Sequence, residues 1–232
     1  MSSIEIEKLK DVTTATITMV LLKHGLRNVW MRGAKPLHGA GRVVGRAFTM
    51  RFLPAREDLA TPASLASNKS TRAAVEAMPS GSIVVVDALG VTDAGIFGDI
   101  LCERMKILGV AGVVSDGVVR DITGVQSVGL PIWCQGTAAP PSVSGLTFVG
   151  WNEPIACGGV VIFPGDVIVA DEDGAVVIPQ TLVEQVIDAA LKQERFEAWV
   201  VSEVRRGVPL LGLYPPNADA QARYAAFKGD TN

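Results

Sequence analysis

The sequence predicts a single α/β domain, and three observations support this prediction. The 232 residues are 48% hydrophobic with a mean hydropathy of +0.32, which is enough to bury one full core. Short strand-like runs form two groups, and a long helical segment follows the second group. We therefore expect one domain over residues 1–232, with a core at about 10–207 and a C-terminal arm at 208–232.

Three helices are predicted from hydrophobic spacing and from the residues that end them. The first covers residues 13–24, and Gly25 follows it as a typical C-terminal stop. The second covers 101–108, where apolar residues recur at helical spacing before another glycine. The third is an amphipathic segment from about 180 to 205. Each of these helices is bordered by a strand-like or glycine-containing segment.

Strands are predicted where β-branched and other apolar residues run between turn residues. In the second group, PGD and DEDG sequences separate the strands. The apolar, proline-interrupted segment VPLLGLYPPN after Gly207 is expected to pack as an arm on the body or on another subunit. The predicted strands are 43–52, 83–87, 111–115, 131–134, 160–163, 167–170 and 175–178.

One spacing in the sequence gathers reactive side chains at a single point of such a fold. Asp99 precedes the second helix, and Arg120 and Asp121 follow the strand at 111–115, with twenty residues between Asp99 and Arg120. A helix of about ten residues rises roughly 15 Å, and five or six strand residues return roughly 17 to 20 Å. Asp99, Arg120 and Asp121 should therefore meet at one edge of the sheet.

The residue types at this point suit an anionic oxo acid. Arg120 offers a planar set of donors to a carboxylate or to an oxyanion, and Asp121 is a single hard oxygen ligand of the kind that suits hydrated magnesium. Asp99 can orient or deprotonate a water. An Arg-Asp pair after a strand can equally be a solvated surface pair or a helix cap. Amides at a helix start also favour an anion; here they are those of Gly98, Asp99, Ile100 and Leu101.

The segment GIFGDILCERMKILGVAGVVSDGVVRDITGV closely resembles the signature of the RraA-like family (regulator of ribonuclease activity A), in particular its 4-hydroxy-4-methyl-2-oxoglutarate aldolase branch. That branch carries an aspartate, twenty residues and then Arg-Asp, as Asp99, Arg120 and Asp121 stand here. The resemblance extends over about residues 10–207. Further matches are VVGRAFTM at 43–50, SIVVVDA at 82–88 and PGDVIVADEDGAVVIP at 164–179.

The resemblance implies a β/β/α swivelling-domain fold, which suits the two strand groups better than a doubly wound sheet. It also implies a class II pyruvate aldolase that cleaves 4-hydroxy-2-oxo acids of the 4-hydroxy-4-methyl-2-oxoglutarate type to pyruvate and a carbonyl product. The cleavage passes through a metal-stabilised enolate, and oxaloacetate decarboxylation is a related activity. Asp121 is the implied ligand of Mg²⁺, Mn²⁺ or another divalent cation. Arg120 is implied to bind substrate and steady the enolate, the 98–101 amides to hold the pyruvate carboxylate, and Asp99 to position the water for proton transfer.

The resemblance further implies a homotrimer or a dimer of trimers, in which an acidic residue from a neighbouring subunit's C-terminal segment supports catalysis. Glu197 matches best and Glu194 competes with it, although glutamates on an amphipathic helix are often only its solvated face. Met19 stands where the family commonly has an aspartate, which would alter the substrate range if that aspartate shapes the pocket. The segments 30–37 and 54–70 are expected to select the C4 substituents.

A non-catalytic regulator of the RraA type, which binds ribonuclease machinery, is the alternative function. The resemblance implies that such regulators lack the aspartate after the arginine, so Asp121 favours the enzyme. Two measurements with 2-oxo acid substrates separate these functions. The enzyme should release pyruvate in the presence of magnesium, and this release should stop when a chelator is added. The expected partner of the enzyme is a small-molecule 2-oxo acid.

Composition limits the remaining partners. A net charge of −3 offers no basic stripe, so nucleic acid is not expected to bind. No apolar run reaches the roughly 18 residues of a membrane span, and the start lacks an apolar signal region, so we expect a cytoplasmic protein without a membrane partner. Cys102, Cys134 and Cys157 have the spacing of neither a disulfide framework nor a zinc site and are expected to be core thiols.

Overall fold

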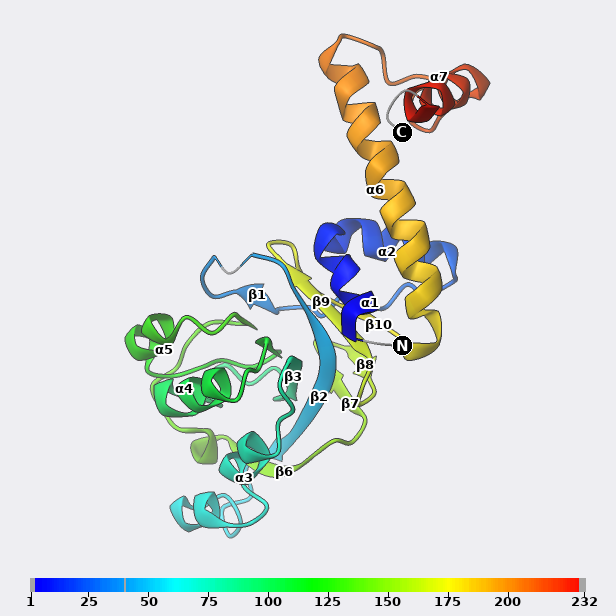
Figure 1. The fold of residues 1–232 in the computed structure, drawn as a ribbon. Helices are drawn as coiled ribbons and strands as arrows, with labels where there is room; N and C mark the ends of the chain where they lie inside the picture. The colour runs from blue at the N-terminus through cyan, green and yellow to red at the C-terminus, as the bar shows by residue number, and fades with distance from the viewer. Residues whose placement is uncertain (1–2, 40, 230–232) are drawn as a thin grey trace.

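The computed structural model describes residues 3–39 and 41–229 and shows a mixed α/β fold around one strongly curved sheet (Figure 1). The strands of this sheet are β1 (Lys35–Pro36), β2 (Val43–Pro54), β3 (Ser82–Asp87), β4 (Gly112–Ser115), β5 (Ile132–Cys134), β6 (Leu146–Trp151), β9 (Val167–Asp171) and β10 (Gly174–Ile178). Their order is β1-β5-β4-β3-β2-β9-β10, and β6 also pairs with β2. A separate hairpin is formed by β7 (Ile155–Cys157) and β8 (Val160–Ile162).

The central strands β2 to β5 run parallel, whereas β6 and β9 pair with β2 in the antiparallel direction. Every residue of β3 is buried, because successive side chains enter two different cores. Ile83 and Val85 point into one core, and Val84 and Val86 point into the other. The parallel centre of the sheet is therefore covered on both faces.

Helices cover one of these faces, and strands cover the other. The helices of the fold are α1 (Ser3–Ile6), α2 (Thr14–Lys23), α3 (Thr71–Glu76), α4 (Asp99–Ile107), α5 (Ile122–Val128), α6 (Val183–Arg205) and α7 (Ala218–Gly229). The core beneath α3, α4 and α5 includes β2 to β5, and the opposite core includes β7 to β10. This layering confirms the predicted α/β class. In addition, α2 and α6 pack against each other, and α2 lies on β9 and β10 (Figure 1).

The predicted helices and strands are all present, with boundaries shifted by one to three residues. Thr13 caps α2 through its side chain, and Gly25 follows the helix with a φ of +82°. The segment predicted as one helix from about 180 contains a 3₁₀ turn, Gln180–Leu182, before α6 begins. Sequence periodicity did not reveal α3, α5, α7, β1, β6 or β7, which are mostly short.

The arm expected after residue 207 folds back on the far half of α6 in its own chain. Trp199 and Val200 of α6 are buried together with Leu213 and Ala220 of the arm. In Figure 1, α6 extends away from the sheet and α7 lies near its outer end. The arm therefore has an apolar contact within the chain.

No helix in residues 3–39 and 41–229 combines the length and apolarity needed to cross a membrane.

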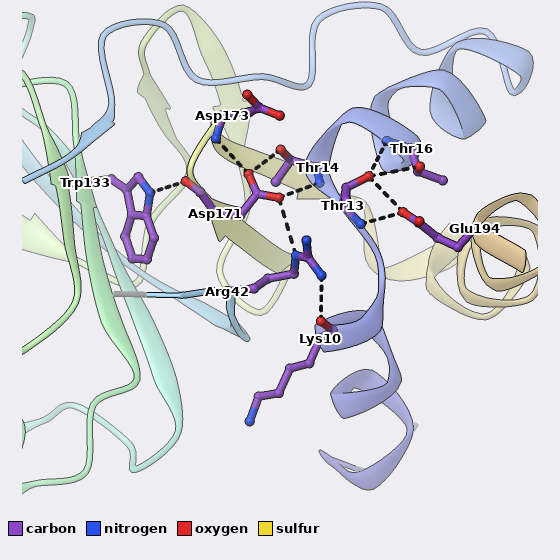
Figure 2. A network of polar contacts seen from close by, with 9 residues as sticks. All are labelled: Lys10, Thr13, Thr14, Thr16, Arg42, Trp133, Asp171, Asp173 and Glu194. Carbon is purple, nitrogen blue, oxygen red and sulfur yellow. Dashed lines mark hydrogen bonds and ion pairs between the residues drawn. The ribbon is translucent and has the colours of Figure 1, made fainter. Parts of the chain in front are cut away.

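A buried aspartate at the end of β9 ties this strand to the start of α2 (Figure 2). Asp171 accepts hydrogen bonds from the Thr14 amide at 2.9 Å, the Thr14 hydroxyl at 2.6 Å and the Asp173 amide at 3.0 Å. Its Oδ2 also lies 3.4 Å from Nε of Arg42, whose Nη1 donates to the Lys10 carbonyl oxygen at 2.7 Å. One carboxylate thus joins three segments that are distant in sequence.

We expect Asp171→Ala to lower the free energy of unfolding by about 2–3 kcal/mol, because it leaves the buried Thr14 amide and Nε of Arg42 without their acceptor. Urea denaturation followed by circular dichroism measures this change. Asp173→Ala is the matched control, since its exposed carboxylate takes no part in the network, and its effect should stay within about 0.5 kcal/mol. Equal losses in both variants would contradict this role of Asp171.

Candidate active site

The residues predicted to form the site line one open cavity of about 270 Å³ beyond the ends of β3 and β4. The chain continues there through a parallel bridge between Gly95 and Val118, which places the start of α4 beside the 118–121 segment. The structure therefore brings together the side chains that the twenty-residue spacing predicted. The predicted residues at this cavity are Gly98, Asp99, Ile100, Leu101, Arg120 and Asp121.

The start of α4 presents free amide groups to this cavity. Gly98 is the N-cap, and it has no side chain that could occupy the first amides. The Ile100 amide donates to Oδ1 of Asp99 at 2.7 Å. Within the described part of the chain, no hydrogen bond uses the amides of Gly98, Asp99 or Leu101. Three of the four predicted amides are thus available to an anion, and the fourth positions Asp99.

Two glycines allow the acidic side chains to approach the neighbouring helix starts. A Cβ at Gly98 would clash with Oδ2 of Asp121, and a Cβ at Gly124 would lie 2.5 Å from Oδ2 of Asp99. The Asp121 carboxylate therefore lies against the α4 start, and the Asp99 carboxylate lies against α5. Each helix start thus receives a carboxylate from the other segment, which holds the two acids at one place.

Arg120 is fixed by its backbone but keeps unused hydrogen-bonding capacity in its side chain. Its amide donates to the Phe97 carbonyl oxygen at 2.8 Å. The Arg120 Nε lies 3.1 Å from Oδ2 of Asp121, yet the geometry is not that of a hydrogen bond, and this buried nitrogen has no acceptor in the described chain. A buried donor without an acceptor is costly. The guanidinium is thus suited to an anion that enters the cavity.

Asp121 adopts a conformation that non-glycine residues rarely use. Its φ of +55° and ψ of +45° lie in the left-handed region, and α5 begins directly after it. This conformation costs about 1–2 kcal/mol, and such strain often accompanies functional sites. The Asp121 carbonyl oxygen accepts from the Val125 amide at 3.0 Å, so the first turn of α5 helps to hold the strained residue.

The three cysteines are buried and unpaired, as predicted for core thiols. Burial, with a smaller effect of the nearby Asp99 carboxylate, raises the pKa of the Cys102 thiol to about 12. Burial also raises the pKa values of Cys134 and Cys157. All three thiols are therefore protonated at neutral pH and are unsuited to nucleophilic catalysis.

Neither of the two C-terminal glutamates lines this cavity within the chain. Glu197 on α6 accepts hydrogen bonds from Gln193 at 2.7 Å and from the Tyr214 hydroxyl at 2.8 Å. Glu194 accepts from both the amide and the hydroxyl of Thr13 at 2.8 Å (Figure 2). Burial acts to raise the pKa of Glu194, but these hydrogen bonds lower it on balance. Glu194 thus supports the start of α2, whereas the predicted role of Glu197 requires a neighbouring subunit.

Several lining residues were not singled out by sequence reasoning. Leu65 lies within the 54–70 segment that was expected to contact substrate, but Arg72 of α3 and Ser142 had no motif that marked them. None of residues 30–37 lines the cavity, contrary to expectation. Met19 is exposed on α2 and lines a different groove, of about 580 Å³, so it does not shape this cavity within the chain.

The fold and the site together define a class of protein: an α/β protein with a cavity that combines helix-start amides, a guanidinium and two carboxylates. The chain belongs to the RraA-like family, because the family model described as Aldolase/RraA matches residues 10–177. A protein of Halalkalibacterium halodurans named "Putative 4-hydroxy-4-methyl-2-oxoglutarate aldolase" is 38% identical over 196 residues, which cover 84% of this chain and 87% of that protein.

Solved structures agree with this family. Streptomyces coelicolor RraAS2, described as an unusual member of the RNase ES inhibitor RraA protein family, superposes with a TM-score of 0.78 at 36% identity, covering 86% of this chain and 96% of that one. An uncharacterized protein from Pseudomonas syringae pv. tomato gives the same TM-score at 26% identity, covering 90% and 96%. The similar proteins thus include one named as an aldolase and one named in connection with a ribonuclease inhibitor.

Proposed function

We propose that this protein is a divalent-metal-dependent lyase that cleaves 4-hydroxy-2-oxo acids to pyruvate and a carbonyl product. One observation carries the proposal: Asp99, Arg120 and Asp121 surround the same cavity as three free amides at the start of α4. In this set, the amides can bind the carboxylate of a 2-oxo acid, Arg120 can bind its ketone oxygen, Asp121 can hold the cation, and Asp99 can take part in a proton transfer. Decarboxylation of oxaloacetate needs the same groups and is a related activity of the proposed enzyme.

Asp121 fits a metal site with a single protein carboxylate. Its side chain is 44% exposed, and the missing Cβ of Gly98 lets its Oδ2 lie against the start of α4. Residues 3–39 and 41–229 contain no group of three or more His, Cys, Asp or Glu side chains that could hold a cation. This suits Mg²⁺ or Mn²⁺, since Mg²⁺ keeps several waters and binds through one or two carboxylates. The bound cation would supply Lewis-acid polarisation of the 2-oxo acid.

The remaining groups of the chain bind the substrate and meet the charge that develops during cleavage. The free amides of α4 hold the carboxylate next to the ketone, at the positive end of the helix dipole. When the C3–C4 bond breaks, its electron pair moves toward C3 and negative charge develops on the ketone oxygen. The unpaired Nε of Arg120 can donate to that oxygen, which makes Arg120 the group that stabilises the enolate.

Asp99 is the proposed partner of the water that moves the proton. Cleavage requires loss of the proton from the C4 hydroxyl, and protonation at C3 then yields pyruvate. Because the Ile100 amide holds Oδ1 of Asp99, its Oδ2 is left to act on a water. Glu197 of a neighbouring copy is proposed to support this step in a homotrimer or a dimer of trimers. Glu197 belongs to α6 and does not line the cavity of its own chain, and α6 extends away from α4 and α5 (Figure 1).

The proposal is tested by coupling pyruvate release to lactate dehydrogenase. We expect purified protein to release pyruvate from 4-hydroxy-2-oxoglutarate and from oxaloacetate with Mg²⁺, to stop when EDTA is added in excess, and to resume when Mg²⁺ is restored. The name of the Halalkalibacterium halodurans relative supports this result. Absence of turnover on a panel of 4-hydroxy-2-oxo acids, with the fold intact, would instead favour a non-catalytic regulator, as the name of the Streptomyces coelicolor relative suggests.

A further inference from the structure

Arg72 is a second cation at the cavity, and it comes from a segment distant from the motif. It lies in the first turn of α3 and lines the same cavity as Asp99 and Arg120. Its Nη1 donates to the Leu65 carbonyl oxygen at 2.8 Å, which fixes the guanidinium against the segment that borders the cavity. The other donors of this guanidinium, which has five N–H groups, remain available to a ligand.

The charge of Arg72 is not matched by any carboxylate of the described residues. By contrast, Arg104 on the nearby α4 is paired with Glu76 at 2.8 Å, and Arg120 lies beside Asp121. The two acids of the cavity are already assigned: Asp99 is held by the Ile100 amide, and Asp121 lies against the α4 start. An arginine at a cavity with free donors and no acidic partner is suited to bind a carboxylate from solution.

The cavity also has the size and the extension that a small diacid needs. Its volume of about 270 Å³ lies below the usual range for drug-sized ligands. An adjoining hollow of about 230 Å³ shares Leu65, Thr71 and Ser142 with it and also contains Lys69. The cavity therefore adjoins a second hollow that carries a further basic side chain.

We infer that Arg72 binds a second carboxylate of the substrate, at the end remote from the 2-oxo group, and so selects dicarboxylic 2-oxo acids. This inference rests on the proposed function, because the α4 amides set the position of the first carboxylate and Arg120 that of the ketone oxygen. Arg72 is a specificity-determining residue in this assignment and takes no part in bond cleavage. Its removal should therefore weaken the binding of diacids while leaving monoacids unaffected.

A binding experiment tests this without any turnover. 2-Oxoglutarate and 2-oxopentanoate both lack the 4-hydroxyl, so neither can be cleaved, and they differ in the distal carboxylate. In isothermal titration calorimetry with Mg²⁺, the wild-type protein should bind 2-oxoglutarate about 10- to 100-fold more tightly. Arg72→Gln should abolish this preference and leave the affinity for 2-oxopentanoate unchanged. Arg104→Gln is the matched control, because Arg104 lies outside the cavity, and it should keep the preference.

A turnover experiment separates this inference from the proposed function. For 4-hydroxy-2-oxoglutarate, Arg72→Gln should reduce kcat/KM about 10- to 100-fold, mainly through KM, whereas kcat/KM for 4-hydroxy-2-oxopentanoate should not change. Arg72→Lys should retain part of the preference.

Equal pyruvate release from both substrates by the wild type, or equal losses of kcat/KM for both substrates in Arg72→Gln, overturns the inference and leaves the lyase proposal intact. A binding preference that depends on Arg72 but comes with no pyruvate release supports the inference and overturns the lyase. Absence of any binding preference overturns the inference in every case.

Discussion

Asp121→Asn should reduce kcat for pyruvate release by at least about 10³-fold, equivalent to about 4 kcal/mol of transition-state stabilisation. Asp121 is the one carboxylate that the proposal assigns to the cation, so the substitution removes the protein's charge from the proposed metal site. Asparagine is chosen because it tolerates the left-handed conformation at this position and keeps the side-chain size. The fold should therefore survive, and the loss should reflect the missing charge.

The measurement combines steady-state kinetics with a Mg²⁺ titration. In the variant, the Mg²⁺-dependent shift of the melting temperature should disappear along with activity, because binding to the folded state is what raises the melting temperature. Asp188→Asn on α6 is a suitable control, since this exposed aspartate lies outside the cavity. Wild-type turnover by Asp121→Asn at the same Mg²⁺ concentration would show that another group holds the cation.

Arg120→Lys should lower kcat by about 10²- to 10³-fold, although it preserves the positive charge. Lysine lacks the planar set of donors, and its ammonium cannot reproduce the position of the buried Nε, which has no acceptor in the described chain. The effect should fall mainly on kcat, because the proposed contact strengthens as charge develops on the ketone oxygen.

The contrast with Arg72 makes this second prediction specific. Both arginines line one cavity, but the Arg72 variants should change KM for diacids, whereas Arg120→Lys should change kcat for monoacids and diacids alike. The Mg²⁺ affinity of Arg120→Lys, measured by the melting-temperature shift, should stay close to that of the wild type. A variant that keeps kcat within about threefold of the wild type would remove Arg120 from the proposed chemistry.

The site motif was predictable because its geometry is local. The helix from Asp99 and the strand that ends at Ser115 have fixed rises per residue, so the distance along the chain sets where Asp99 and Arg120 meet. The same holds for the buried strand β3, whose continuous run of apolar residues is typical of a parallel strand covered on both faces. Gly109, with a φ of +79°, likewise marked the end of α4.

Elements whose partners lie far along the chain were not predictable in this way. β6 exists as a strand because it pairs with the outer half of β2, and the short α3 depends on the core that it covers. Short segments have weak intrinsic preferences, so tertiary packing decides their structure. The arm after residue 207 was recognised as apolar from the sequence. Only the structure showed that it packs on α6, where Trp199 is buried together with Leu213 and Ala220 of the arm.

The sequence by itself determined the α/β class, the main strands and helices, the family resemblance, and the meeting of Asp99, Arg120 and Asp121. Only the tertiary structure decided that Arg72 joins them, that Arg120 keeps an unpaired nitrogen, and that Glu194 is engaged at the start of α2. The physical reason is the range of the interactions. Periodicity and rise per residue act within one or two elements, whereas a free charge or a missing acceptor depends on every segment that surrounds it.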